Sequence, residues 1–149
     1  QAYRTYIGQG VTVGPFCQLR PGTRLEEKVH VGDFVELKNA HIGQGTKVPH
    51  LSYVGDADVG EGVNFGCGCV TANYDRVHKH RTTVGDHAFI GCHTNLIAPV
   101  AVGENAFTAA GSTITKDVPA DALAVERARQ INLEGWVRRR HPERYGEPK

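Results

Sequence analysis

This chain of 149 residues lacks methionine altogether and is poor in aromatic side chains, with one Trp, five Tyr and five Phe. A natural full-length chain begins with Met, so its absence predicts a fragment of a longer parent rather than a processed mature chain. The few aromatic residues, together with 18 Gly, argue against a bulky globular core and favour a fold with many tight corners.

An excess of one charge and long apolar runs are also missing. Lys and Arg number 17 against 16 Asp and Glu, a net charge of +1, so the composition does not favour nucleic acid or a membrane surface as a partner. No apolar run reaches the roughly 20 residues of a membrane-spanning helix, and no signal-peptide pattern is present. We therefore expect a cytoplasmic protein that binds neither nucleic acid nor membrane.

The four cysteines do not form a known metal or disulfide pattern. None stands in the paired CxxC spacing of a structural zinc site, and disulfide frameworks are typical of small secreted domains. We expect free thiols and no bound metal. The cysteines are Cys17, Cys67, Cys69 and Cys92.

What the sequence does contain is a six-residue repeat. An aliphatic residue, commonly followed by Gly, recurs every six positions, and the fifth position of each hexad is small or β-branched. This alternation predicts short strands whose first and fifth side chains face inward, and three strands per coil of about 18 residues predict a hexapeptide β-helix. The apolar first positions include Ile7, Val13, Leu19, Leu25, Val31, Leu37, Ile42, Val48, Val54, Val59, Phe65, Val84, Ile90, Leu96, Val102 and Ile114.

The repeat has three irregularities. It slips by one residue near Ala40-His41 and again near residues 56–58. Between residues 71 and 83 it gives way to a polar segment, TANYDRVHKHRTT, which predicts a loop projecting from the stack. Loops on a rigid scaffold commonly carry function.

After Ile114 the repeat stops. We predict a β-helix domain over residues 1–118 and a C-terminal extension over residues 119–149, with a helix around 133–140 and a frayed tail. A terminal element should cover the open end of the solenoid, because the last coil would otherwise expose its edge and core.

The hexad register brings two basic residues together. Arg20 and Lys38 are 18 positions apart with no slip between them, so we expect them to stack in adjacent coils, about 4.8 Å apart. Like charges held this close repel each other. A phosphate group would offset the repulsion, since Arg offers a bidentate fork and Lys a point charge. We favour an anion site over two solvated basic residues.

The same register places an imidazole on a neighbouring edge. His50 is third in its hexad and faces outward, with Asp33 one coil before it and Cys67 one coil after it in the same place. Glu36 and Tyr53 share the corner between His50 and the basic pair. His is the usual general base near neutral pH, so His50 is a candidate base, although most lone histidines are surface or packing residues.

The register also sorts the other candidate ligands. Cys17 fills an inward fifth position, as does Cys69, and both are expected to be small core residues. Cys67 and Cys92 fill outward third positions and are expected to be accessible thiols. The remaining pair, His78 and His80, lacks a third ligand at metal-site spacing and is best interpreted as part of a solvated loop.

Several runs resemble a known family. FVELKNA, HLSYVGDA, VNFGCG and TANYD are similar to segments of the acetyltransferase half of the bifunctional N-acetylglucosamine-1-phosphate uridyltransferase/glucosamine-1-phosphate acetyltransferases (the GlmU family), and the resemblance covers nearly the whole chain. It implies an all-β fold, a left-handed parallel β-helix, in a homotrimer. The handedness comes from the resemblance alone, since parallel crossovers are generally right-handed.

The resemblance also implies an activity. Acetyl-CoA would donate its acetyl group to the amine of glucosamine 1-phosphate, giving N-acetylglucosamine 1-phosphate for UDP-N-acetylglucosamine and cell-wall precursor synthesis. His50 would act as the general base for direct transfer, without a covalent enzyme intermediate. In the family, the Mg²⁺ site belongs to the Rossmann-like uridyltransferase half, which is not in this chain. The resemblance therefore implies no metal for this chain.

Individual roles follow from the same resemblance. Sugar-phosphate and sugar contacts would come from Arg20, Lys38, Tyr53 and Asn64, and the acetyl-CoA groove would be lined by Cys67, Asn73, Tyr74, Cys92, Ala110 and Arg127. Glu36 is hypothesised to orient His50, and Lys79 to add a phosphate contact. Arg76 stands where the family usually has Gly, and Leu133 replaces a Lys of some relatives, but neither change removes a catalytic group.

Three alternatives remain at this stage. Another hexapeptide acyltransferase would acetylate a different amine or hydroxyl. A trimeric γ-type carbonic anhydrase would need three His ligands, whose spacing is not evident. A non-catalytic scaffold would only trimerise its parent protein.

Overall fold

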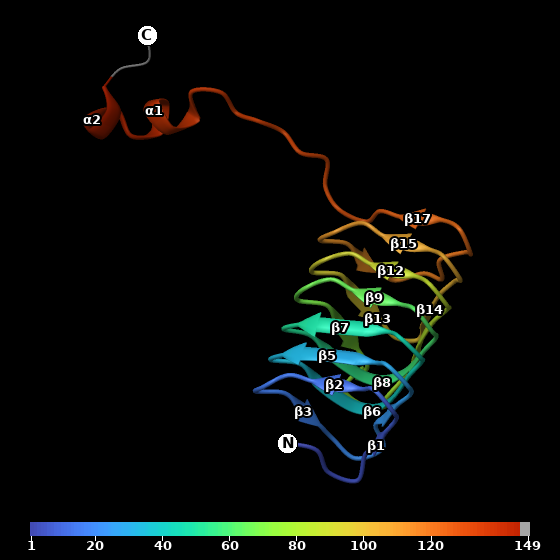
Figure 1. Ribbon diagram of the computed structural model, residues 1–149. Coiled ribbons are helices and arrows are strands. Elements are labelled where there is room, and N and C mark those ends of the chain that lie inside the picture. The colour runs from blue at the N-terminus through green and yellow to red at the C-terminus, as the bar shows by residue number, and fades with distance from the viewer. Residues whose placement is uncertain (147–149) are drawn as a thin grey trace.

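The computed structural model describes residues 1–146, which form a left-handed parallel β-helix followed by an extended C-terminal arm (Figure 1). The solenoid predicted from the repeat is confirmed. Its strands are β1 (Tyr6–Ile7), β2 (Thr12–Val13), β3 (Gln18–Leu19), β4 (Arg24–Leu25), β5 (His30–Asp33), β6 (Glu36–Ile42), β7 (Lys47–His50), β8 (Tyr53–Val59), β9 (Asn64–Phe65), β10 (Val70–Ala72), β11 (Thr82–Val84), β12 (Phe89–Ile90), β13 (Asn95–Ile97), β14 (Val100–Val102), β15 (Phe107–Thr108), β16 (Thr113–Ile114) and β17 (Leu123–Ala124).

Strands from successive coils pair in parallel and form two sheets. One sheet follows the order β2-β5-β7-β9-β12-β15-β17, and the other follows β1-β4-β6-β8-β10-β13-β16 with β3, β11 and β14 paired beside this path. The chain therefore returns to each face once per coil, as the repeat predicts.

The first slip lies where the sequence predicts it. Leu19 pairs with Leu37, 18 positions on, whereas Leu25 pairs with Ile42, 17 positions on. The shortened segment turns a corner inside β6 at Asn39, which has a φ of 47°. β8 turns the same corner at the second slip, so both strands belong to two faces of the coil.

The aliphatic first positions form the core. Leu19, Leu37, Val54 and most of their counterparts are buried, and each buried side chain of this size favours folding by about 1.5–3 kcal/mol. Ile7 and Val13 were expected to face inward but are 46% and 43% exposed. They belong to the first of the described coils, and among residues 1–146 no other coil packs on its outer side.

At Gly32 and Gly55, the lack of a side chain lets neighbouring groups lie close to the backbone. A Cβ at Gly32 would collide with the Pro49 carbonyl oxygen in the next coil, directly before His50. A Cβ at Gly55 would collide with the Tyr53 hydroxyl. Side chains at either position would push these groups away from the coil.

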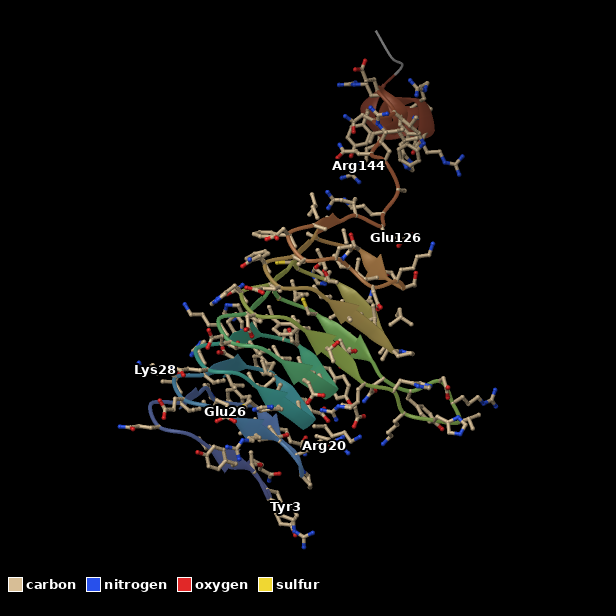
Figure 2. The ribbon with its side chains drawn as sticks, turned by 90° about the vertical axis from the view of Figure 1, so that its right-hand side faces the viewer. Tyr3, Arg20, Glu26, Lys28, Glu126 and Arg144 are labelled. Carbon is tan, nitrogen blue, oxygen red and sulfur yellow. The ribbon has the colours of Figure 1, made fainter. Side chains whose placement is uncertain are left out.

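The projecting loop is shorter than the predicted 71–83. Thr71 belongs to β10 and Thr82 to β11, because both side chains are buried and continue the inward pattern. The loop between these strands, residues 73–81, extends sideways from the stack (Figure 2). A single antiparallel bridge joins Tyr74 and Lys79 across it.

The C-terminal part differs from the prediction in two ways. The helix begins at Trp136 rather than near residue 133, after Gly135 with a φ of 69°, and a second helix replaces the frayed tail, with Pro142 at its first position. The helices are α1 (Trp136–Arg140) and α2 (Pro142–Tyr145). Residues 147–149 of the predicted extension lie outside the described residues.

The sequence led us to expect that the C-terminal extension covers the open end of the solenoid, but the arm does not cover it. β17 still pairs with β15, but the chain then leaves the β-helix (Figure 1), and residues 125–146 are exposed. The division at residues 118/119 stays a prediction. Within the described part of the chain, helices are too short to cross a bilayer.

Candidate active site

One column of outward residues follows an edge of the β-helix. Asp33 pairs with His50, and the pairing of β7 with β9 continues this register to Cys67. The His93 amide donates to the Cys67 carbonyl oxygen at 2.8 Å, which places Cys92 opposite Cys67, and the next coil adds Ala110. We call Asp33, His50, Cys67, Cys92 and Ala110 the corner column.

His50 ends β7 with its side chain exposed. The Ser52 hydroxyl donates to the His50 carbonyl oxygen at 2.8 Å and fixes the turn that follows. Among residues 1–146 no hydrogen bond or ion pair reaches the imidazole itself. Glu36 points its carboxylate at Arg20 instead, so an orienting role of Glu36 toward His50 stays a prediction.

The basic pair has the predicted register. The Arg20 amide donates to the Leu37 carbonyl oxygen at 2.8 Å, which stacks Arg20 over Lys38. The structure adds a carboxylate beside each cation, since Arg20 Nη1 lies 2.8 Å from Glu36 Oε1 and Lys38 Nζ lies 3.0 Å from Asp56 Oδ2. Hydrogen bonding to Glu36 raises the pKa of Arg20. Part of the repulsion inferred from sequence is therefore offset within the protein.

Asp56 is the centre of this network, and sequence reasoning did not single it out. Only 5% of the residue is exposed. Its carboxylate accepts hydrogen bonds from Asn39 Nδ2 at 2.7 Å, Lys38 Nζ at 3.0 Å and Asn73 Nδ2 at 2.5 Å. Burial alone would raise the pKa of Asp56, but the bonds from Asn39 and Lys38 lower it below its ordinary value.

A signal for Asp56 was present in the sequence. The two slips put Asn39 and Asp56 at the same corner of neighbouring coils, both with positive φ. Asn and Asp tolerate this conformation better than most residues.

Lys79 comes from the projecting loop to the same place. The nearby Lys38 ammonium lowers the pKa of Lys79, and Arg20 adds to this effect. We call Arg20, Lys38 and Lys79, with Glu36 and Asp56, the cationic cluster. Its three cations face two carboxylates, an imbalance that favours an anion.

Tyr53 lies between the corner column and the cationic cluster. It pairs with Glu36 across neighbouring coils, and its hydroxyl accepts a hydrogen bond from Asn73 at 3.3 Å. Asn73 is only 8% exposed, and its side chain belongs to the Asp56 network. The place in the acetyl-CoA groove that the resemblance implies for Asn73 stays a prediction. Asn64 stands on β9 in the other sheet, and the structure of the single chain does not bring it to Tyr53.

The far end of the corner column meets the arm. Arg127 donates from Nη1 to the Ala110 carbonyl oxygen at 2.5 Å. A hollow of about 610 Å³ opens there, lined by Val125, Arg127, Ala128, Arg129 and Gln130. Tyr74, another predicted cofactor residue, is exposed on the projecting loop and donates to the Arg76 carbonyl oxygen at 2.6 Å. Cys67, Cys92, Ala110 and Arg127 thus share one edge, while Asn73 and Tyr74 lie on another face.

The projecting loop contains His78 and His80, the pair considered above as possible metal ligands. His80 Nε2 lies 2.7 Å from Asp75 Oδ2. In residues 1–146 there is no group of three His, Cys, Asp or Glu side chains arranged to hold a metal ion.

Comparison with known proteins agrees with this architecture. The pattern of the bacterial transferase hexapeptide family (six repeats) matches residues 81–116. Among solved structures, a point mutant of AntD, an N-acyltransferase from Bacillus cereus, superposes with a TM-score of 0.72 at 15% identity, covering 95% of this chain and 90% of that chain. The acetyltransferase domain of PglB from Neisseria gonorrhoeae gives a TM-score of 0.61 at 18% identity, covering 78% and 51%. These likenesses show the fold.

The fold and the repeat define the class: the chain is a left-handed parallel β-helix built from hexapeptide repeats, and part of it is similar to the bacterial hexapeptide transferases. It is 60% identical over 134 residues to the protein named bifunctional protein GlmU of Caldicellulosiruptor saccharolyticus, covering 90% of this chain and 29% of that protein. The GlmU of Brevibacillus brevis is 64% identical over 121 residues, covering 81% and 26%. The chain is therefore homologous to a segment of the GlmU proteins, as the resemblance predicted, and spans under a third of their length.

Proposed function

We propose that this chain is an acetyltransferase that moves the acetyl group of acetyl-CoA to the amine of glucosamine 1-phosphate. The observation that carries the proposal is the register of the coils. It sets His50 in the same column as the predicted thioester-side residues and puts the cationic cluster beside it, with Tyr53 between. The identity to GlmU proteins and the hexapeptide match support it.

The chemistry assigns His50 the role of general base. The amine nitrogen attacks the thioester carbonyl, His50 accepts a proton from that nitrogen, and the C–S bond breaks as CoA leaves and takes up a proton. The exposed imidazole, which has no partner among residues 1–146, is open to a substrate amine. Backbone N–H groups of the neighbouring coil would stabilise the oxyanion of the tetrahedral intermediate.

The cationic cluster would hold the sugar phosphate. Arg20 offers a planar fork, and Lys38 and Lys79 offer point charges from two different elements. Asp56 and Glu36 fix the cations in place before a ligand arrives. Tyr53 would contact the sugar, with Asn64 completing the site from a second copy of the chain.

The proposal includes an assembly and a cofactor site. Acetyl-CoA would lie along Cys67, Cys92, Ala110 and Arg127, with Asn73 and Tyr74 near it. The separation of these residues over two faces, and the exposed apolar side chains of the arm, support a homotrimer in which neighbouring chains complete each site. We place this enzyme in the cytoplasm.

An acetylation assay tests the activity. The chain is incubated with acetyl-CoA and either glucosamine 1-phosphate or glucosamine, and the acetylated sugar is measured by mass spectrometry, because thiol reagents would also react with Cys67 and Cys92. We expect rapid acetylation of glucosamine 1-phosphate and much slower acetylation of glucosamine. Equal rates would favour another acyltransferase, and no product would favour a scaffold.

A further inference from the structure

Cys67 and Cys92 form a pair of accessible thiols. Cys92 is exposed and Cys67 is half-buried. Cys17 and Cys69, in contrast, are buried, and each donates its S–H to a backbone carbonyl oxygen at 3.1 Å. Burial raises the pKa of Cys69 to about 11. Because the thiolate is the reactive form, thiol chemistry should be confined to the outward pair.

The pair has the geometry for a bond. Residues opposite each other on neighbouring strands are about 4.8 Å apart, within the Cα separations of about 4.4–6.8 Å seen in disulfides. The Cys92 sulfur also leans toward the coil of its partner, since a Cβ built at Gly66 would lie 2.9 Å from Cys92 Sγ. A side chain at Gly66 would collide with that sulfur, so glycine at this position leaves it room between the two coils.

We propose that Cys67 and Cys92 form a dithiol site that low-molecular-weight disulfides oxidise to a Cys67–Cys92 disulfide. One cysteine thiolate attacks the small disulfide RSSR, forming a mixed disulfide and releasing RS⁻. The other thiolate attacks the cysteine sulfur of the mixed disulfide and releases the second RS⁻. The two cysteines lose two electrons and two protons, and the small disulfide is reduced to two thiols.

The consequence for activity rests on the proposed function. The dithiol lies in the corner column next to His50, on the edge proposed to receive the acetyl thioester. A disulfide there would join two coils across this wall. We expect the oxidised protein to lose acetyl transfer and to regain it after reduction.

The site is tested by mapping disulfides in the full chain. The protein is incubated with CoA disulfide or glutathione disulfide, the remaining thiols are blocked, and the tryptic peptides are analysed without reduction. Cleavage after Arg76, Lys79 and Arg81 separates the peptides that carry Cys67 and Cys92. We expect a link between these peptides and a loss of two hydrogen atoms in mass.

Variants make the test specific. Cys67→Ser should stop the reaction at a mixed disulfide on Cys92, whereas the control Cys17→Ala should still form the link. Circular dichroism checks that each variant is folded. Four free thiols in the treated wild-type chain, or a mixed disulfide that persists there without the link, would overturn the proposal.

Comparing the reaction rates with the two oxidants tests the dithiol site and the proposed acetyl-CoA site separately. A faster reaction with CoA disulfide than with glutathione disulfide supports both the dithiol site and a CoA site along the column. Equal rates, with the link formed, support the dithiol site and count against CoA binding there. A linked protein that keeps its full acetyl-transfer rate overturns the inhibitory role.

Discussion

The corner column and the cationic cluster are built by the same coil register but differ in how their side chains are held. In the cluster, Arg20 and Lys38 each face a carboxylate, and Asp56 also binds two Asn side chains. In the column, the described residues leave the His50 imidazole exposed and without a side-chain partner. The side chains of the cationic cluster are therefore held by ion pairs and hydrogen bonds before any ligand arrives, whereas the His50 imidazole in the corner column is open to solvent.

The difference suits the chemistry that we propose for each region. A phosphate site gains from charges fixed in advance, because little ordering is then needed on binding. A general base must instead exchange a proton with a group that arrives from outside. The comparison predicts that changes in the column affect rate with little effect on stability, and that changes in the cluster affect stability as well.

The largest expected effect is on His50. We predict that His50→Ala lowers the acetyl-transfer rate about 10²–10⁴-fold, as expected for loss of a general base, with an unchanged circular dichroism spectrum. The measurement is steady-state acetylation of glucosamine 1-phosphate. His30→Ala is the matched control, because His30 is also an exposed strand histidine but binds the Thr12 hydroxyl. A His50→Ala chain that retains near-full rate would remove the column from the mechanism.

A smaller effect, on stability, is expected in the cluster. Asp56→Asn keeps the shape of the side chain and suits its positive φ but removes the charge that binds Lys38. We predict a loss of about 1.5–3 kcal/mol in the free energy of unfolding, the range for hydrogen bonds to a charged group, measured by urea denaturation.

Asp121→Asn is the control for this substitution. Asp121 has a similar backbone conformation, with a φ of 59°, but is exposed and accepts one hydrogen bond from Asn105. The Asp121→Asn substitution should lower the free energy of unfolding by no more than about 0.5 kcal/mol. Similar losses for the two variants would mean that the Asp56 network does not stabilise the fold more than a surface contact does.

The sequence predicted the fold well because the repeat is a direct record of spatial neighbours. The register of Arg20 with Lys38, of Asp33 with His50 and of Glu36 with Tyr53 was read from spacing and is confirmed. Periodicity constrains backbone position strongly, since a shift of one residue would turn apolar side chains outward.

Side-chain partners were harder to predict than register. The repeat does not say that Glu36 turns to Arg20, or that Asn73 folds in to Asp56, because these choices depend on rotamers and on a loop whose path has no period. The direction of the arm was also missed. Residues 125–146 are all exposed, so this part of the chain has no alternation of buried and exposed positions from which its path could be predicted.

The smallest effect concerns the loop that brings Lys79 to the cluster. Asp75 Oδ1 accepts the amides of His78 and Val77 at 2.6 and 2.8 Å, and Oδ2 faces His80. These contacts, with the His78 amide first, lower the pKa of Asp75 from 3.8 to about 2. Because the folded-state pKa is depressed, the carboxylate stabilises the loop fully above pH 3.8 and loses this effect as the pH falls through about 2.

We therefore predict that the Asp75 carboxyl titrates with a midpoint of about 2 in carbon-detected NMR. His80→Asn should raise the midpoint only in part, because the two backbone amides remain and the first of them is the main cause of the shift. If Asp75 titrates at the ordinary value of 3.8, the loop is not held by this carboxylate. Lys79 would then reach the cationic cluster from a loose segment, and the contrast between a pre-arranged cluster and an open column would apply only to Arg20 and Lys38.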